Sequence, residues 1–92
     1  MALRLVVTFQ AMPGKGDELA KAWLPRLIEV QREPGCEQYE VFHSIQRPDT
    51  IVLLERWTDA ASLDAHSAMN RAREPIGADL RDGGAVAERF EV

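Results

Sequence analysis

The chain has 92 residues, of which 46% are hydrophobic and 28% charged, and its formal net charge is −4. This length and composition indicate one small globular domain spanning residues 1–92. The negative charge and the absence of a Lys or Arg run argue against nucleic-acid binding, which needs a basic surface to displace counterions. The apolar segment at the N-terminus is too short for a signal peptide or a membrane span, so we expect a cytoplasmic protein that contacts no membrane.

The first third of the chain has the pattern of a strand followed by a helix. Residues 3–10 are largely apolar at both odd and even positions, which is typical of a strand covered on both sides. A turn with two glycines leads into a helix predicted for residues 17–32, whose apolar residues form one broad stripe. Pro25 has no amide hydrogen to donate to the carbonyl of Lys21, so we expect this helix to bend there.

The next segment, residues 35–57, has the pattern of a hairpin. A polar break at residues 46–49 separates an alternating run from a β-branched and aromatic run at residues 51–57, so the two should pair as antiparallel strands. Thr58 and Asp59 can then cap a helix. The residues that helical spacing places on one face of this helix are Leu63, His66 and Asn70.

The chain closes with a weak helical turn near Ile76 and Leu80 and a last strand at residues 85–92. The order β-α-β-β-α-β predicts an α+β, ferredoxin-like fold with an antiparallel sheet and both helices on one face. Strands that are apolar on both sides need a cover for the other face as well. In a chain this short we expect that cover to be the same face of a second copy, which makes a homodimer through the sheet face.

The residue types and their spacing give little support for a metal site or for a catalytic nucleophile. The imidazole and thiol groups are His43, His66 and Cys36, and they lack the HxxxH, HExxH or CxxC spacing of metal motifs, so no metal is expected. No GxSxG turn presents a serine nucleophile. Cys36 directly follows Gly35 at a strand start, which indicates a packing residue rather than a reactive thiol.

A pocket between the helices and the sheet is the remaining candidate. Strand parity places Trp57 and Glu55 on one face, and His66 and Asn70 can reach the same space from the following helix, with His43 as a second candidate beside them. A neutral histidine, whose ordinary pKa is about 6.5, can take a proton from a hydroxyaromatic substrate, and the electron-rich anion can react with dioxygen. The alternative is that Trp57 is a core or interface aromatic and that each histidine is only a polar surface residue.

The segments GCEQYEVFHS, VLLERWTD and SLDAH strongly resemble the antibiotic biosynthesis monooxygenase family of small dimeric proteins. The resemblance implies a dimeric α/β-barrel, and members of this family include cofactor-free oxygenases, haem degraders and an isomerase. His43 and Trp57 look like the strand histidine and strand-end tryptophan associated with the pocket of monooxygenase members. Those members carry an asparagine four residues before the tryptophan, where this chain has Leu53.

The haem-degrading members have an asparagine on the first strand and a haem-ligating histidine several residues beyond the position of His66. This chain has Phe9 on the first strand, and Asn70 and Arg71 where that ligand would stand. The resemblance therefore disfavours haem and implies a protein without a cofactor.

Our leading hypothesis is a homodimeric, cofactor-independent, monooxygenase-like protein acting on a hydroxyaromatic or quinol-type small molecule. His43 or His66 would be the base, with His43 favoured because a strand holds its side chain more rigidly, and Trp57 would form a wall. The residues expected to bind the substrate are Phe9, Tyr39, Leu53 and Asn70. The rival hypotheses are a non-catalytic dimeric module for small-molecule binding or stress response, and an isomerase of the same fold.

Overall fold

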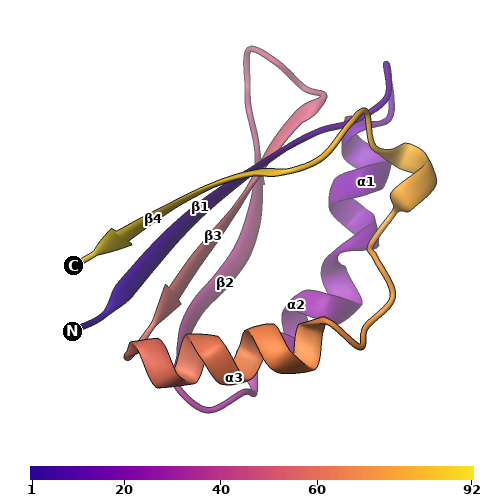
Figure 1. The fold of residues 1–92 in the computed structure, drawn as a ribbon. Coiled ribbons are helices and arrows are strands. Elements are labelled where there is room, and N and C mark those ends of the chain that lie inside the picture. The colour runs from indigo at the N-terminus through magenta and orange to yellow at the C-terminus, as the bar shows by residue number, and fades with distance from the viewer.

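The computed structural model describes residues 1–92 as four strands, three α-helices and one 3-10 turn (Figure 1). The elements in chain order are β1 (Leu3–Gln10), α1 (Gly16–Ala22), α2 (Leu24–Gln31), β2 (Cys36–His43), β3 (Thr50–Trp57), α3 (Ala60–Asn70), the turn η1 (Ala78–Leu80) and β4 (Val86–Glu91). The strands form one antiparallel sheet in the order β2-β3-β1-β4, with the helices packed on one face. The predicted ferredoxin-like α+β fold is therefore confirmed.

The segment predicted as one bent helix over residues 17–32 is two helices, α1 and α2, separated by Trp23. The amide of Trp23 donates to the carbonyl of Ala20 at 3.1 Å, which is the tighter i to i−3 pattern of a helix end. Pro25 explains the break, because it cannot donate to the carbonyl of Lys21. The break lies at the expected place, and it leaves Trp23 buried against the sheet.

The start of α3 is fixed by a cap and by a neighbouring loop. The carboxylate of Asp59 accepts a hydrogen bond from the amide of Ser62 at 2.8 Å, as the sequence predicts. The loop that follows α2 passes this first turn at Gly35, where a Cβ atom would lie 2.1 Å from Ser62 Oγ and the φ angle is +81°. Glycine is required there on both counts. Because Gly35 has no side chain, the loop can pass close to α3, and Glu33, two residues earlier, can lie beside this helix.

The core lies between the helices and the inner face of the sheet. Its fully buried large side chains are Trp57, Tyr39, Leu19, Ile51 and Val30. On the outer face no helix covers the sheet: Val6 and Leu54 on the central strands are half-buried, and Phe42 and Phe90 on the edge strands are each 46% exposed. The middle of the central strands is thus apolar on both faces, as expected, while Arg4 and Arg56 pair at one end of the outer face. None of the helices combines the length and the hydrophobicity needed to cross a bilayer.

Candidate functional site

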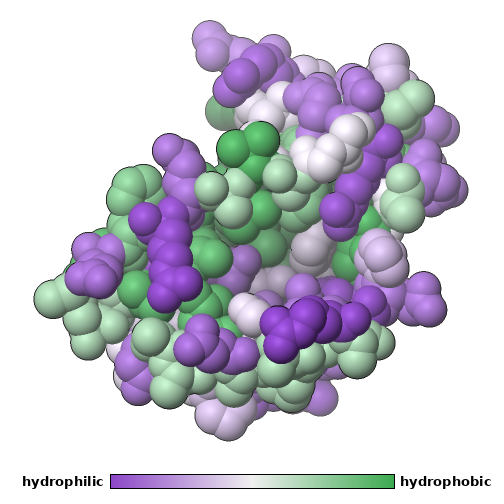
Figure 2. Space-filling view, in the orientation of Figure 1, coloured by the Kyte–Doolittle hydropathy of each residue, from purple (hydrophilic) through white to green (hydrophobic).

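A cavity of about 420 Å³ opens between α3 and the sheet region formed by β1, β3 and β4. In the space-filling view, both hydrophobic and hydrophilic residues bound the hollow between α3 and the strands (Figure 2). The predicted face of α3 is confirmed, since all three of its residues lie on this cavity. The lining residues are Leu5, Val7, Glu55, Leu63, His66, Ser67, Asn70, Arg71 and Ala87.

His66 is the buried titratable residue on the helix side of this cavity, with 4% of its surface exposed. Its Nδ1 atom lies 2.9 Å from Oε1 of Glu33, and its Nε2 atom has no hydrogen-bond partner in the chain. A carboxylate at Nδ1 accepts the proton of that nitrogen, so in the neutral ring Nε2 carries the free lone pair. The geometry thus leaves Nε2 of a neutral His66 ring free to accept a hydrogen bond.

Two aromatic rings hold the His66 imidazole in place. Trp57 stacks on it with 4.7 Å between ring centroids and 29° between planes, and Tyr39 meets it edge-on at 5.5 Å. Trp57 is completely buried and lies behind the imidazole rather than among the residues that line the cavity. The structure therefore brings Trp57 and His66 together as predicted, but Trp57 supports the imidazole instead of forming a wall.

Glu55 is a buried carboxylate on the cavity wall, and we did not select it as a functional residue from the sequence. Its Oε1 atom accepts a hydrogen bond from Trp57 Nε1 at 3.0 Å, and the residue is 6% exposed. Burial raises the pKa of Glu55, although the Trp57 hydrogen bond and the nearby His66 oppose the rise. The signal was present in the sequence, because strand parity places this charged residue on the same buried face as Trp57.

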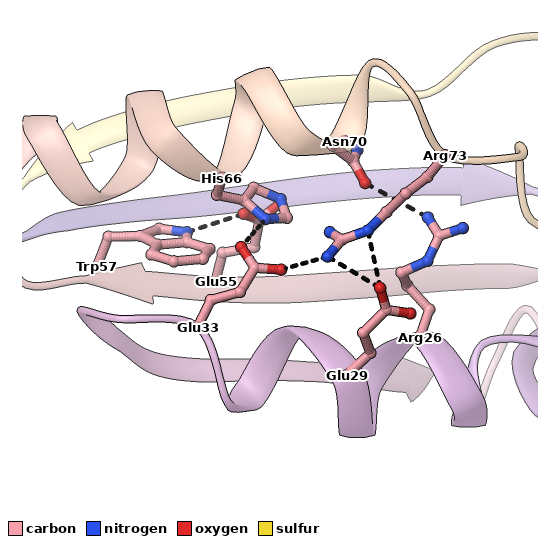
Figure 3. A network of polar contacts seen from close by, with 8 residues as sticks. All are labelled: Arg26, Glu29, Glu33, Glu55, Trp57, His66, Asn70 and Arg73. Atoms are coloured by element: carbon pink, nitrogen blue, oxygen red, sulfur yellow. Dashed lines mark hydrogen bonds and ion pairs between the residues drawn. The ribbon is translucent and has the colours of Figure 1, made fainter.

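Glu33 and Arg73 complete the polar network, and the sequence analysis missed both. Arg73 Nη2 lies 2.8 Å from Oε2 of Glu33 and 3.0 Å from Oε1 of Glu29, so one guanidinium bridges two carboxylates (Figure 3). Glu33 and Arg73 side chains are only 8% and 15% exposed. Burial alone would lower the pKa of Arg73, but the two carboxylates outweigh it and the Arg73 pKa is raised. Nearby, Arg26 Nη1 donates to Asn70 Oδ1 at 3.3 Å.

His43 lies at the other end of the sheet. It pairs with Ile51, six residues along β3 from Trp57, which is about 20 Å at the rise of a strand. His43 is exposed, and its Nε2 atom lies 3.2 Å from the carbonyl oxygen of Gly16 at the start of α1. The expectation that His43 shares the space of Trp57 and His66 is wrong, because antiparallel pairing holds it beside the turn of the hairpin.

The four residues expected to bind substrate divide into two groups. Asn70 lines the cavity. Phe9, Tyr39 and Leu53 are at most 4% exposed and belong to the core, and none of them lies on the cavity. Phe9, for example, packs against Trp23 with 5.2 Å between ring centroids. Their side chains therefore belong to the core and do not line this cavity.

The remaining chemistry-bearing residue is Cys36, at the start of β2 opposite Trp57. Burial, followed by the negative charges of Glu33 and Glu55, raises the pKa of the Cys36 thiol to about 11. It is a poor nucleophile for that reason. No group of three or more His, Cys, Asp or Glu side chains converges in a way that would hold a metal ion.

A family model described as antibiotic biosynthesis monooxygenase matches residues 2–74 of the 92. The match extends from before β1 to beyond α3 and thus includes Glu33, Glu55, His66 and Arg73. Among curated proteins, none has a sequence that matches this chain.

Several solved structures have the same fold at low sequence identity. A conserved protein from Methanosarcina mazei Go1 is 24% identical with a TM-score of 0.80, and the match covers 98% of this chain and 91% of that chain. Rv0793 from Mycobacterium tuberculosis is 21% identical with a TM-score of 0.80, covering 100% and 95%. A protein named antibiotic biosynthesis monooxygenase is 20% identical with a TM-score of 0.76, covering 98% and 97%. These likenesses establish the fold alone.

Proposed function

Since the chain belongs to the antibiotic biosynthesis monooxygenase family, we propose that it is a cofactor-independent, monooxygenase-like enzyme that acts on a hydroxyaromatic or quinol-type small molecule. The observation that carries this proposal is the buried His66 on the wall of a cavity of about 420 Å³, with Glu33 hydrogen-bonded to its Nδ1 atom from behind the cavity lining. Cavities of about 300 to 1,000 Å³ are typical of small-molecule sites, so an aromatic substrate of a few rings fits.

Burial and partners support His66 rather than His43 as the base. When a substrate hydroxyl donates its proton to His66 Nε2, an imidazolium forms next to the carboxylate of Glu33, which stabilises the positive charge. Arg71 at the cavity supplies a positive charge that favours the substrate anion. Deprotonation and anion stabilisation are thus the two tasks of this site.

The electron-rich anion then reacts with dioxygen without a cofactor. The net change removes one hydrogen atom from the substrate hydroxyl and one from the ring carbon that gains an oxygen atom, and the second oxygen atom leaves as water. The substrate itself supplies all four electrons, so no external reductant is needed. Trp57 and Tyr39 contribute by holding the imidazole at a fixed orientation.

The test is oxygen uptake with a panel of quinols and anthrones in metal-free buffer, with mass analysis of the product. We expect dioxygen consumption equal to substrate consumption, and a product that has lost two hydrogens and gained one oxygen.

In Ala87→Phe a phenyl ring would occupy the cavity, and we expect turnover to fall at least roughly tenfold because the substrate is displaced from His66. Ala85→Phe, two residues earlier and off the cavity, is the matched control and should keep its turnover.

Two outcomes favour the rival functions. Saturable binding of panel compounds without oxygen uptake indicates a non-catalytic binding or stress-response module. Conversion to a product of unchanged mass, with no oxygen consumed, indicates an isomerase.

We also propose that the protein is a homodimer through the outer face of the sheet, because the middle of the central strands is apolar there and the edge residues Phe42 and Phe90 are half-exposed. Light scattering at micromolar concentration should give twice the chain mass. Leu54→Glu buries a charge in the centre of that face and should abolish the dimer. Leu24→Glu, at a leucine that is 56% exposed on α2, is the control and should remain dimeric. A folded wild-type monomer would contradict the proposal.

A further inference from the structure

The carboxylate of Glu33 contacts two side chains: Arg73, which is a cation, and His66, which becomes one when it is protonated. One of its carboxylate oxygens lies 2.9 Å from His66 Nδ1 and the other 2.8 Å from Arg73 Nη2, and its side chain is 8% exposed (Figure 3). Arg73 lies in the segment that follows α3. His66 and Arg73 therefore contact the same carboxylate from neighbouring parts of the chain. His66, Glu33 and Arg73 thus form a continuous row of polar contacts, here called the charged row, that is largely shielded from water.

We propose that Arg73 is a positioning residue that acts through Glu33 to keep His66 neutral and ready to accept a proton. This inference rests on the proposed function, in which His66 is the base. Arg73 itself lies outside the residues that line the cavity and therefore acts on the substrate only through Glu33.

The charges that face His66 come from several elements. Glu33 bonds to it from the end of the α2 segment, Glu55 lies near it on β3, and the neutral Tyr39 contacts it from β2. Directly after its own helix, the charged residue Arg71 lines the same cavity. The two carboxylates would together draw a proton onto the imidazole, and an imidazolium cannot accept a second one. Arg73 offsets the charge of Glu33, while Glu55 is favoured in its neutral form by burial.

The experiment is an NMR titration of the two histidines in the full chain without substrate. The exposed His43 is identified by His43→Gln, which leaves the His66 signals alone. In Arg73→Gln we expect the midpoint of the His66 titration to rise by about one pH unit or more relative to wild type, because Glu33 is left with His66 as its only cationic partner. Arg73→Lys keeps the charge but not the fork that bridges two carboxylates, so its midpoint should rise by less. Arg26→Gln removes an arginine of the same network that does not contact Glu33, and it should leave the midpoint in place.

A second measurement tests whether the effect of Arg73 on His66 depends on Glu33. In a Glu33→Gln background, the additional change Arg73→Gln should move the midpoint by less than half of its effect in wild type. If an active substrate is found, the pH profile of Arg73→Gln should shift to higher pH and recover its rate there, which a merely structural loss would not do.

The inference is overturned if neither Arg73→Gln nor Arg73→Lys raises the His66 midpoint, or if Arg26→Gln raises it equally. Arg73→Lys keeps the test decisive if Arg73→Gln fails to fold. The titration uses no substrate, so its result stands apart from that of the oxygen-uptake assay. A raised midpoint without any turnover would support the charged row and reject the proposed enzyme function.

Discussion

The two histidines of this chain lie at opposite ends of the inner face of one sheet, and their surroundings differ in every respect that matters for proton transfer. His66 is 4% exposed, stacked on Trp57, in edge-on contact with Tyr39, and hydrogen-bonded to a buried carboxylate. His43 is exposed and contacts the carbonyl of Gly16. Burial strengthens electrostatic interactions because it removes water, so only the His66 end can tune a proton acceptor with neighbouring charges.

The same contrast appears in packing. The Trp57 end carries the buried Trp57 and Tyr39 and the charged row, whereas the end near His43 closes in a turn where Ile45 is fully exposed. A side chain held by packing keeps its orientation and its partners, and one at an exposed turn does not. The lesson is that residue type and resemblance selected two candidates, but burial separates them.

The largest expected effect is on turnover. His66→Ala should slow the reaction by roughly 10²- to 10⁴-fold, the usual contribution of a general base. His43→Ala should stay within about threefold of wild type, because substitutions at exposed sites change free energies by roughly 0.5 kcal/mol. Rates are compared with a substrate whose hydroxyl ionises well above the assay pH, so that it needs a base. Equal losses in the two variants would remove the distinction between the two ends.

The next effect is on stability. Trp57→Ala deletes a fully buried indole and should lower the free energy of unfolding by about 3 to 5 kcal/mol. Ile45→Ala, in the exposed turn at the other end, should change it by roughly 0.5 kcal/mol or less. Urea denaturation at one fixed protein concentration measures both, since dimerisation makes stability depend on concentration. A small loss for Trp57→Ala would show that this end is not the better packed one.

The fold followed from local patterns. Alternation predicted the strands, the apolar stripe and Pro25 predicted a helix that bends near residue 25, and Thr58 and Asp59 predicted the start of α3. The helical period also predicted which residues of α3 face the cavity. These features depend on residues close in sequence, for which periodicity and capping are reliable guides.

The site depended on contacts between distant residues. Glu33 lies 33 residues before its partner His66, and no local pattern connects them. His43 is a different case, because the hairpin alone implies that a residue beside the turn pairs with Ile51 and not with Trp57. That register was available from the sequence, and its use would have set His43 apart from His66.

Cys36 provides a probe of the negative charge at the His66 end. Only the thiolate is alkylated rapidly, and a rise in the Cys36 pKa from 9.0 to about 11 lowers the thiolate fraction at pH 8 by about 100-fold. We therefore expect iodoacetamide to modify the folded protein about 100-fold more slowly than the urea-unfolded chain, with the rate rising steeply up to pH 10. Slow modification that does not respond to pH would point to steric shielding instead of a raised pKa.

The smallest effect concerns Glu55 and the pH dependence of stability. Burial is the main cause that raises the pKa of Glu55 in the folded chain above its ordinary 4.5. The proton is thus bound more tightly in the folded state, so the stability that it contributes is fully present below pH 4.5 and is lost as the pH rises through the folded-state pKa. Glu55→Gln stays neutral throughout and can still accept the Trp57 hydrogen bond. Its free energy of unfolding, relative to wild type, should therefore increase from pH 4 to pH 7.

Glu74→Gln, at an exposed carboxylate beyond α3, is the control and should follow wild type across the same range. A flat difference for Glu55→Gln would mean that the cavity wall hydrates this carboxylate, and that its charge contributes fully to the field at His66.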